Sequence, residues 1–371
     1  MAPSPNDDKK KNTLVALLGR RDTPTDGVAD YCGFLATALE SREIQVSLAR
    51  VSWMEDGWLG GLRKLWRESI EWRGQWVLLQ YTALSWSRRG FPFGALAALA
   101  ILRRRGVRCA VVFHEPNRQG GSNLLQSGRG ACQDWVIRKL YDRASKSIFT
   151  VPLETVAWLP AGEDKAAFIP IGANIPERVY RRAGPAQAGK VKTVIVFGVS
   201  DSREAAAPEV NVISDVMLEA SGKLGRLRLV VLGRGAVESR ELLAKAFHRS
   251  DVDLEVRGVL PAEQVADEFE SADALLFVRG PVTLRRGSAL AAVASGIPIV
   301  GYRGEAFSGP LERLGVEWCT WQDHESLTRG LIRVLSDSQR WTELHERNLE
   351  VQRNYLSWNR IAERFQAILA P

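Results

Sequence analysis

The stretch ADALLFVRGPVTLRRGSALAAVASGIPIVGY, residues 272–302, decides the fold that we expect for the whole chain. Its apolar run 274–278 has the length and composition of a buried strand. The alanine-rich segment 289–295 favours a helix whose small side chains can lie close against a sheet. Gly296 is placed to end that helix, and 297–300 begins a second apolar strand. The spacing therefore predicts a strand–loop–helix–strand unit of a parallel α/β sheet.

The loop of this unit carries residues that suggest a function. Arg285 and Arg286 stand just before the expected helix, Gly287 follows them, and Ser288 is expected to cap the helix. In a parallel sheet the first N–H groups of such a helix face the carboxyl edge, where a phosphate can bind. An anion site is one interpretation. An ordinary crossover with solvated arginines is the other, and the spacing alone does not separate them.

Strand and helix patterns alternate in two runs along the rest of the chain. The first run covers 13–177, the second covers 193–355, and 356–371 predicts a final helix. Residues 178–192 lose all periodicity and are rich in Gly, Pro, Ala and basic residues, which is typical of a linker. The fold class that follows is α/β, with two doubly wound, Rossmann-like domains facing across a cleft.

Three local predictions concern element boundaries. Residues 118–130 hold four glycines with Ser and Asn, which favours a mobile loop, and a helix is expected only from 134 to 145. In the second run we expect a helix over 209–220 and a short strand over 254–256.

The composition limits the class of protein. At 371 residues the chain is long for one core and sufficient for two domains. Its hydrophobic content of 45% and charged content of 25% are typical of globular proteins. No apolar run approaches the ~20 residues that span a bilayer, and residues 1–12 are expected to be a polar, disordered tail. The four cysteines form no CxxC pair, so we expect neither disulfides nor zinc, and a reducing cytoplasm fits.

The net charge of +7 favours an anionic partner. A nucleotide, an anionic membrane surface and nucleic acid all satisfy that condition. The arginines are spread along the chain and no nucleic-acid-binding motif is present, so nucleic acid is the partner that we expect least.

Two further segments carry candidate residues. His114 and Glu115 stand at the tip of the strand expected over 109–115, where α/β folds bind ligands. A lone histidine is more often structural, but a His-Glu pair at a strand tip is a better candidate. Residues 53–76 hold five tryptophans interleaved with four basic side chains. This composition suits either an interfacial membrane contact or a helix that buries its tryptophans in the core.

Taken in order, several segments resemble the GT-B glycosyltransferases, and among them glycosyltransferase family 4. The matching segments are 26–31, 113–115, 170–174, Phe197-Gly198 with Arg203, and the unit 272–302. The resemblance covers most of the chain. It implies a first domain that binds the acceptor and a second that binds a nucleotide-sugar donor. It also implies that the final helix, 356–371, crosses back to the first domain.

The resemblance also assigns roles to residues. It implies catalytic roles for His114, Arg286 and Arg203, and places Glu115 and Asp30 on the acceptor or sugar side. The donor-binding residues that it implies are Gly27, Gly198, Gly233, Arg257, Gly258, Arg285, Gly287 and Ser288.

One departure from the family pattern stands in the donor unit. The family usually has two glutamates there, eight positions apart, and the second binds the ribose. Thr283 and Ala291 occupy these places. We therefore expect arginines and helix amides to hold the diphosphate. No acidic pair of the DxD type stands at a suitable loop, so no metal and no cofactor are expected.

The function that we expect is a metal-independent hexosyltransferase that acts with retention. It would move a sugar from a nucleotide-sugar to a saccharide or lipid-linked acceptor in polysaccharide or glycoconjugate synthesis. It would be cytoplasmic and peripheral on the inner face of the membrane. One alternative is a non-catalytic GT-B protein that binds a nucleotide or glycan as a partner. Another is a different GT-B enzyme, such as a sugar-phosphate epimerase, although no acidic residues stand at the positions expected for one.

Overall fold

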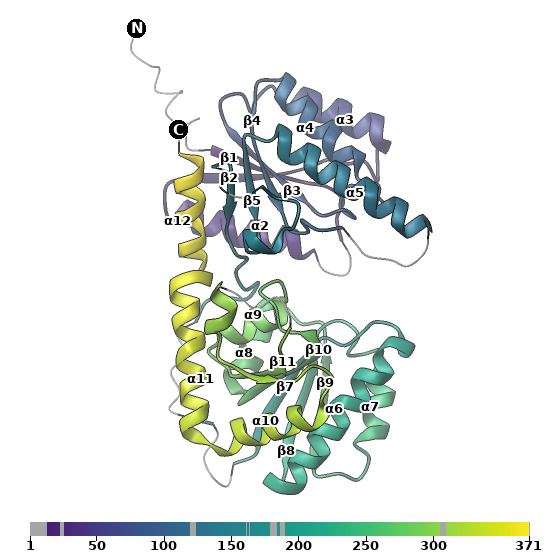
Figure 1. Cartoon of the computed structure of the whole chain (residues 1–371), viewed down its shortest axis with the longest axis vertical. Coiled ribbons are helices and arrows are strands. Elements are labelled where there is room, and N and C mark those ends of the chain that lie inside the picture. The colour runs from purple at the N-terminus through teal and green to yellow at the C-terminus, as the bar shows by residue number, and fades with distance from the viewer. Residues whose placement is uncertain are drawn as a thin grey trace. The chain divides into compact units, whose positions relative to one another are not determined.

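The computed structural model in Figure 1 describes residues 13–22, 26–118, 124–160, 162, 164–178, 184–185, 190–304 and 309–370. The chain divides into two compact units. The N-terminal unit consists of residues 1–172 together with 358–371, and the C-terminal unit consists of residues 173–357. No helix of the described residues is both long enough and apolar enough to cross a membrane.

The N-terminal unit contains a parallel six-stranded sheet with the order β2-β1-β3-β4-β5-β6. Its strands are β1 (Thr13–Leu18), β2 (Gln45–Arg50), β3 (Trp76–Tyr81), β4 (Arg108–Phe113), β5 (Lys146–Phe149) and β6 (Ala166–Phe168). Its helices are α2 (Gly27–Glu40), α3 (Gly57–Glu68), α4 (Phe93–Arg104), α5 (Leu124–Arg143) and α12 (Trp358–Leu369), with a short 3₁₀ turn at Leu153–Thr155.

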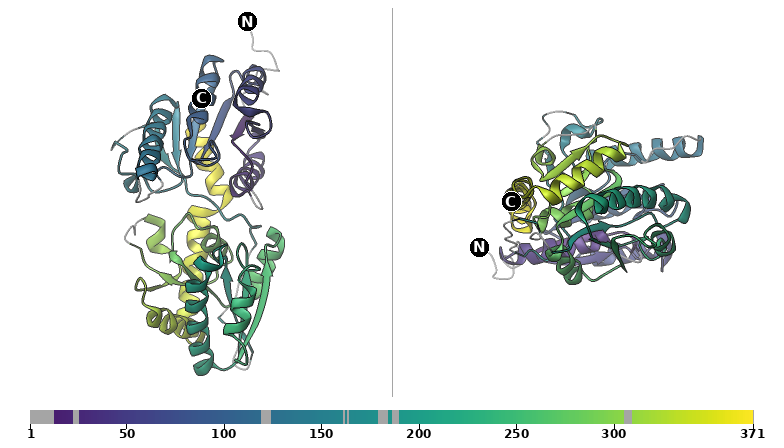
Figure 2. Two further views of the ribbon diagram at one scale, coloured as in Figure 1. Left: turned by 90° about the vertical axis from the view of Figure 1, so that its right-hand side faces the viewer. Right: turned by 90° about the horizontal axis from the view of Figure 1, so that it is seen from below.

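Both faces of this sheet are covered. Val15 and Leu17 of β1 pack into a core with α3, α4 and α5, while Leu14 and Ala16 pack into a second core with α2 and α12. Helices accordingly lie on both sides of the sheet in Figure 2. Alternate residues of a strand point to opposite faces, so a strand that is buried on both faces has to be apolar throughout.

The C-terminal unit repeats this plan with the strand order β12-β11-β10-β7-β8-β9, again all parallel. Its strands are β7 (Lys192–Phe197), β8 (Leu227–Leu232), β9 (Val252–Gly258), β10 (Ala274–Pro281), β11 (Ile299–Tyr302) and β12 (Val316–Cys319). Its helices are α6 (Arg203–Leu224), α7 (Arg240–Ala246), α8 (Ala262–Ser271), α9 (Gly287–Ala294), α10 (His324–Ser336) and α11 (Ser338–Val351). A 3₁₀ turn at Gly309–Arg313 and a π-helical turn at Gln352–Leu356 complete the unit. The predicted class, two doubly wound α/β units, is confirmed.

Two element boundaries were predicted wrongly. Helix α5 begins at Leu124, so the predicted loop is wrong for residues 124–130, while 119–123 lie outside the described residues. The helix continues through Gly128 and Gly130, and the buried Gln133 side chain of the same helix donates to the carbonyl of Gly90 at 3.0 Å. Helix α6 begins at Arg203, not 209, because the Ser202 hydroxyl accepts from the N–H of Ala205 and caps the helix.

Two further details differ from prediction. Strand β9 is longer than 254–256, because Asp253 and Glu255 pair with arginines of the neighbouring β8 and its approach. The predicted cap Ser288 is the second residue of α9, and Arg286, with an extended backbone, holds the cap position instead. The expected end of this helix is confirmed, since Gly296 adopts a φ of 69° directly after it.

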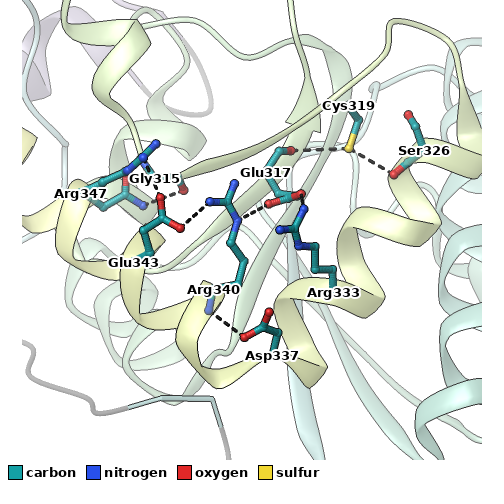
Figure 3. Close-up of polar contacts among 10 residues, drawn as sticks. Gly315, Glu317, Cys319, Ser326, Arg333, Asp337, Arg340, Glu343 and Arg347 are labelled. Atoms are coloured by element: carbon teal, nitrogen blue, oxygen red, sulfur yellow. Dashed lines mark hydrogen bonds and ion pairs between the residues drawn. The ribbon is translucent and has the colours of Figure 1, made fainter.

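A network of ion pairs ties β12 to the last two helices of the C-terminal unit (Figure 3). Glu317 of β12 accepts from Nε of Arg340 at 2.7 Å and from Nη1 of Arg333 at 3.4 Å. Arg340 also donates to Glu343 at 2.7 Å. The Glu317 side chain is only 12% exposed, so its charge depends on these two guanidinium groups.

Candidate functional site

The carboxyl edge of the C-terminal sheet carries arginines above two glycines. Arg279 and Gly280 lie near the end of β10, which extends to Pro281. A Cβ placed on Gly198 would lie 3.2 Å from Nη1 of Arg279, and a Cβ on Gly280 would lie 3.9 Å from Nη2 of Arg286. Both glycines have positive φ angles, 88° and 80°. The backbone therefore carries no side chain next to either guanidinium group, and a ligand can approach it closely.

Glu209 fixes one side of this edge. Its carboxylate accepts from the N–H of Ser200 at 2.8 Å and from the Ser200 hydroxyl at 2.7 Å. Nε of Arg279 lies 3.8 Å from the same carboxylate. Glu209 therefore holds the loop between β7 and α6 and orients Arg279. Sequence reasoning missed both residues, although an arginine directly before a glycine at a strand end was a usable signal for Arg279.

Arg286 lies among other positive charges. Partial burial, followed by the charges of Arg279 and Arg285, lowers the pKa of Arg286, and Glu209 opposes the shift. We call Arg279, Arg285 and Arg286 the cationic cluster. Cations that disfavour one another's charge favour a bound anion, because the anion offsets their repulsion. The predicted pair Arg285 and Arg286 is thus joined by a third arginine.

The start of α9 supplies backbone groups beside the cluster. Gly287 and Ser288 are its first two residues, and the N–H groups of a first helical turn have no acceptor within the helix. The helix is buried from Ala289 to Ala294, and Ala291 is 1% exposed. Ala291 therefore cannot supply the ribose contact of the missing glutamate. At the other family position, the Thr283 hydroxyl accepts from the N–H of Arg285 at 3.4 Å.

The glycines predicted at the other strand ends hold the edge together. Gly198 donates its N–H to Leu232 at 2.7 Å, and Gly233 donates to Gly258 at 2.6 Å. Gly233 has a φ of 89°, and a Cβ there would lie 2.7 Å from the ring of Phe197. These hydrogen bonds join the ends of β7, β8 and β9, and the predicted donor-binding role of these glycines stays a prediction.

Two predicted arginines make other contacts. Arg257 pairs with Glu255 at 2.7 Å and with Glu268 at 3.4 Å, along the edge strand β9. Arg203 opens α6 with a side chain that is 72% exposed, and its Nη1 lies 3.8 Å from Glu241. Arg203 is not among the charges that shift the pKa of Arg286. The catalytic role of Arg203 and the donor-binding role of Arg257 stay predictions. Each of these guanidinium groups already has a carboxylate partner.

In the N-terminal unit, His114 follows β4 directly, as predicted. Its Nε2 lies 2.8 Å from Oε1 of Gln80 on the neighbouring strand β3. Gln80 donates its amide to the carbonyl of Leu78 at 3.2 Å, so its oxygen faces the histidine as an acceptor. Nε2 of His114 therefore carries the hydrogen and Nδ1 presents a lone pair. Burial lowers the pKa of His114 to about 4, so the ring is neutral at pH 7.

Aromatic and polar contacts orient this region. The ring of Tyr31 meets the imidazole of His114 edge-on, with centroids 5.0 Å apart, and Trp358 of α12 lies 5.4 Å from Tyr31. Glu115 accepts from the N–H of Ala83 at 3.4 Å, which joins the loops after β4 and β3. Sequence reasoning found His114 and Glu115 but missed Gln80 and Tyr31.

The start of α2 already holds a carboxylate. Asp26 accepts from the N–H of Ala29 at 3.1 Å and pairs with Arg50 at 3.0 Å. Partial burial and then the charge of Asp26 raise the pKa of Asp30. Gly27 is exposed between them. The negative charge of Asp26 weighs against a phosphate at Gly27, whose predicted donor contact remains a prediction. Within the described ranges, no group of three or more His, Cys, Asp or Glu side chains could hold a metal ion.

Solved structures share this fold. A glycosyltransferase from Rickettsia africae matches with a TM-score of 0.64 and 12% identity, covering 97% of this chain and 99% of that protein. A Listeria monocytogenes protein assigned as a UDP-N-acetylglucosamine 2-epimerase matches with a TM-score of 0.60 and 12% identity, covering 96% and 95%. A mutant of S. aureus TarM, in complex with fondaparinux, alpha-GlcNAc-glycerol and UDP, matches with a TM-score of 0.58 and 12% identity. That match covers 84% of this chain and 59% of TarM, so the chain spans about three fifths of TarM's length.

Identities this low show the fold alone, which is that of the GT-B glycosyltransferases. No protein-family model and no curated protein matches the sequence. Membership of glycosyltransferase family 4 therefore remains a prediction.

Proposed function

We propose that the protein is a glycosyltransferase that uses a nucleotide-sugar donor and binds the donor diphosphate at the cationic cluster. The observation that carries the proposal is the crowding of Arg279, Arg285 and Arg286 above the bare glycine backbone at the carboxyl edge. Each guanidinium offers a planar pair of N–H donors that suits phosphate oxygens. A diphosphate would also offset the repulsion that helps to lower the pKa of Arg286.

The cluster would act on the leaving group. Transfer breaks the bond between the anomeric carbon of the sugar and a phosphate oxygen, and negative charge grows on the diphosphate as that bond breaks. Cations already fixed at this point stabilise the transition state more than the bound substrate. The amides of Gly287 and Ser288 would add the partial positive charge of a helix start. Glu209 acts by orienting Arg279.

His114 would position a sugar. A neutral imidazole with its hydrogen on Nε2 offers Nδ1 as an acceptor for a hydroxyl of the donor sugar or of the acceptor. The edge contact with Tyr31 and the bond to Gln80 hold the ring in that orientation.

The finer assignments rest on the family resemblance. We propose membership of family 4, transfer of a hexose with retention, and independence of metal ions. We also propose a saccharide or lipid-linked acceptor in polysaccharide or glycoconjugate synthesis, at the cytoplasmic face of a membrane.

Thermal-shift measurements with UDP-, GDP- and ADP-sugars test the proposal, because a ligand that binds only the folded state raises the melting temperature. One donor is expected to stabilise the wild type. Arg286→Ala is expected to abolish that shift while the melting temperature without ligand stays nearly unchanged. Arg329→Ala, which removes another exposed arginine of the same unit, is the control and should keep the shift. An equal shift in Arg286→Ala would refute the assignment.

Loss of both family carboxylates supports a second candidate, a non-catalytic protein that binds a nucleotide or glycan. The buried Ala291 is the residue that favours it. A bound nucleotide-sugar that is neither transferred nor hydrolysed would identify this case. Conversion of the donor to its epimer without an acceptor would identify the epimerase instead.

A further inference from the structure

Exposed apolar side chains of the described residues concentrate in one part of the N-terminal unit. Of thirteen large hydrophobic residues that are exposed, seven stand between positions 54 and 135. They are Met54, Leu59, Trp66, Ile70, Leu84, Phe93 and Trp135. We call these seven residues and the basic side chains among them the apolar–basic face.

Helix α3 contributes an apolar stripe that the core does not use. Leu59, Trp66 and Ile70 are spaced by seven and four positions, so they lie on one side of the helix and of the turn that follows it. Leu59 is 74% exposed and Trp66 is 42% exposed. The opposite side of the helix, with Gly61 and Leu65, is buried against the unit. Packing of the unit therefore gives no reason for the exposed stripe.

The apolar–basic face continues onto α4, which lies beside α3, and onto α5, which lies beside α4 (Figure 1). Trp58 stacks on Trp53 with centroids 4.8 Å apart, and it fills the space that a side chain at Gly94 would need. Leu59 follows Trp58 in α3, and Phe93 precedes Gly94 at the start of α4. The ring of Phe93 in turn lies 6.1 Å from that of Trp135 on α5. Aromatic contacts thus connect α3 to α4 and α4 to α5.

Positive charge accompanies these apolar groups. Residues 54–105 contain nine arginine and lysine side chains against four acidic ones. The guanidinium of Arg105 lies 4.7 Å from the ring centre of Trp66, and Nε of Arg88 lies 3.3 Å from the sulfur of Met54. Arg63 and Arg67 are exposed along the same stripe of α3. Apolar and aromatic groups interleaved with cations complement the surface of an anionic bilayer, whose headgroups attract the charges and whose boundary accepts the rings.

We propose that the apolar–basic face docks this protein onto an anionic lipid bilayer, with Leu59, Trp66 and Phe93 entering the headgroup boundary. The inference deepens the proposed function, because the bilayer would supply a lipid-linked acceptor. Docking needs no donor and no chemistry, so vesicle binding and donor binding can fail independently.

Cosedimentation of the full chain with vesicles tests the proposal, with no nucleotide present. The wild type is expected to pellet with mixed phosphatidylglycerol–phosphatidylcholine vesicles at low salt, and to be released at high salt. Leu59→Ser/Trp66→Ser is expected to reduce the affinity about tenfold or more, because both side chains lose their apolar burial in the boundary. Leu218→Ser/Trp321→Ser removes the same residue types, 37% and 47% exposed, from the C-terminal unit and should bind like the wild type.

Several outcomes would overturn the proposal. They are failure of the wild type to bind anionic vesicles, equal binding to pure phosphatidylcholine at all salt concentrations, and equal loss in both double variants. Pelleting without vesicles that is abolished by Leu59→Ser/Trp66→Ser would show that the face binds a second copy of this chain instead. If the double variant melts earlier than the wild type, Leu59→Ser alone, at the most exposed of the seven positions, provides the same comparison.

Discussion

At the scale of single residues, the candidate site could be predicted only where the chemistry lies in consecutive positions. His114 and Glu115 follow an apolar strand, and Arg285 and Arg286 precede an alanine-rich helix, so the sequence alone indicated all four. Gln80 joins His114 only because β3 pairs with β4, which local periodicity does not reveal. Arg279 and Glu209 likewise meet from β10 and α6.

The low pKa of His114 predicts how stability depends on pH. Its folded-state pKa of about 4 lies below the ordinary value of 6.5, so the unfolded chain binds the proton more readily. The neutral ring therefore makes its full contribution to the free energy of unfolding above pH 6.5. That contribution is lost as the pH falls from 6.5 toward 4. The pKa shift corresponds to at most ~3 kcal/mol of the free energy of unfolding. The actual contribution is smaller, because the His114 side chain is only partly buried. Denaturant unfolding at pH 7 and pH 4.5 measures the difference in the free energy of unfolding between the two pH values. This difference should be smaller in His114→Gln than in the wild type.

Gln80→Glu tests the hydrogen bond that orients the imidazole. A carboxylate 2.8 Å from Nε2 favours the charged ring, so the pKa of His114 is expected to rise above its wild-type value. An NMR titration of the His114 ring resonances gives this pKa directly. An unchanged value would mean that the side chain at position 80 does not face the ring.

At the scale of elements, long apolar runs and strong periodicity were sufficient for prediction. The strand predicted over 274–278 begins at Ala274 as β10, and the final helix predicted over 356–371 is α12, which runs from Trp358 to Leu369. The misplaced boundaries depend on contacts that composition hides. The start of α6 rests on a serine cap, α5 continues through glycines that are tolerated within a packed helix, and β9 is extended by cross-strand ion pairs. The predictions of the linker and of the tail fall largely on residues outside those described.

Gly233→Ala tests how tightly the carboxyl edge is built. A methyl group there meets both a positive φ and the ring of Phe197, so we expect a loss of ~2–4 kcal/mol in the free energy of unfolding. Gly309→Ala is the matched control, with a φ of 62° and open space around the added carbon, and should cost only ~1 kcal/mol. Denaturant unfolding compares the two, and equal losses would contradict the steric argument.

Glu317→Gln tests the ion-pair network of Figure 3. The substitution leaves Arg340, 19% exposed, without the charge of one of its two carboxylate partners, so a loss of ~1–3 kcal/mol in the free energy of unfolding is expected. Glu325→Gln removes one side of the exposed pair with Arg329 and should cost less than ~0.5 kcal/mol. Melting temperatures of the two variants give the comparison. A smaller loss at position 317 than at position 325 would contradict it.

At the scale of the whole molecule, each unit is a parallel sheet of six strands, but only the C-terminal unit comes from one continuous segment. Helix α12 belongs to the N-terminal unit, where Trp358, Ile361 and Phe365 are buried beside α2. Ending the chain after Ser357 is therefore expected to unfold the N-terminal unit. Each buried side chain of this size contributes ~1.5–3 kcal/mol, and their sum rivals the 5–15 kcal/mol that typically stabilises a domain. Limited proteolysis should degrade the N-terminal unit of the shortened chain and spare the C-terminal one.

The placement of α12 has a consequence for biosynthesis. A ribosome delivers residues 13–172 first, but the surface of α2 that receives Trp358 and Phe365 stays uncovered until the last helix has emerged. Every residue of the other unit is available before that moment. The part of the protein that is translated first is therefore completed last. A nascent chain most needs a chaperone while this apolar surface of α2 is uncovered.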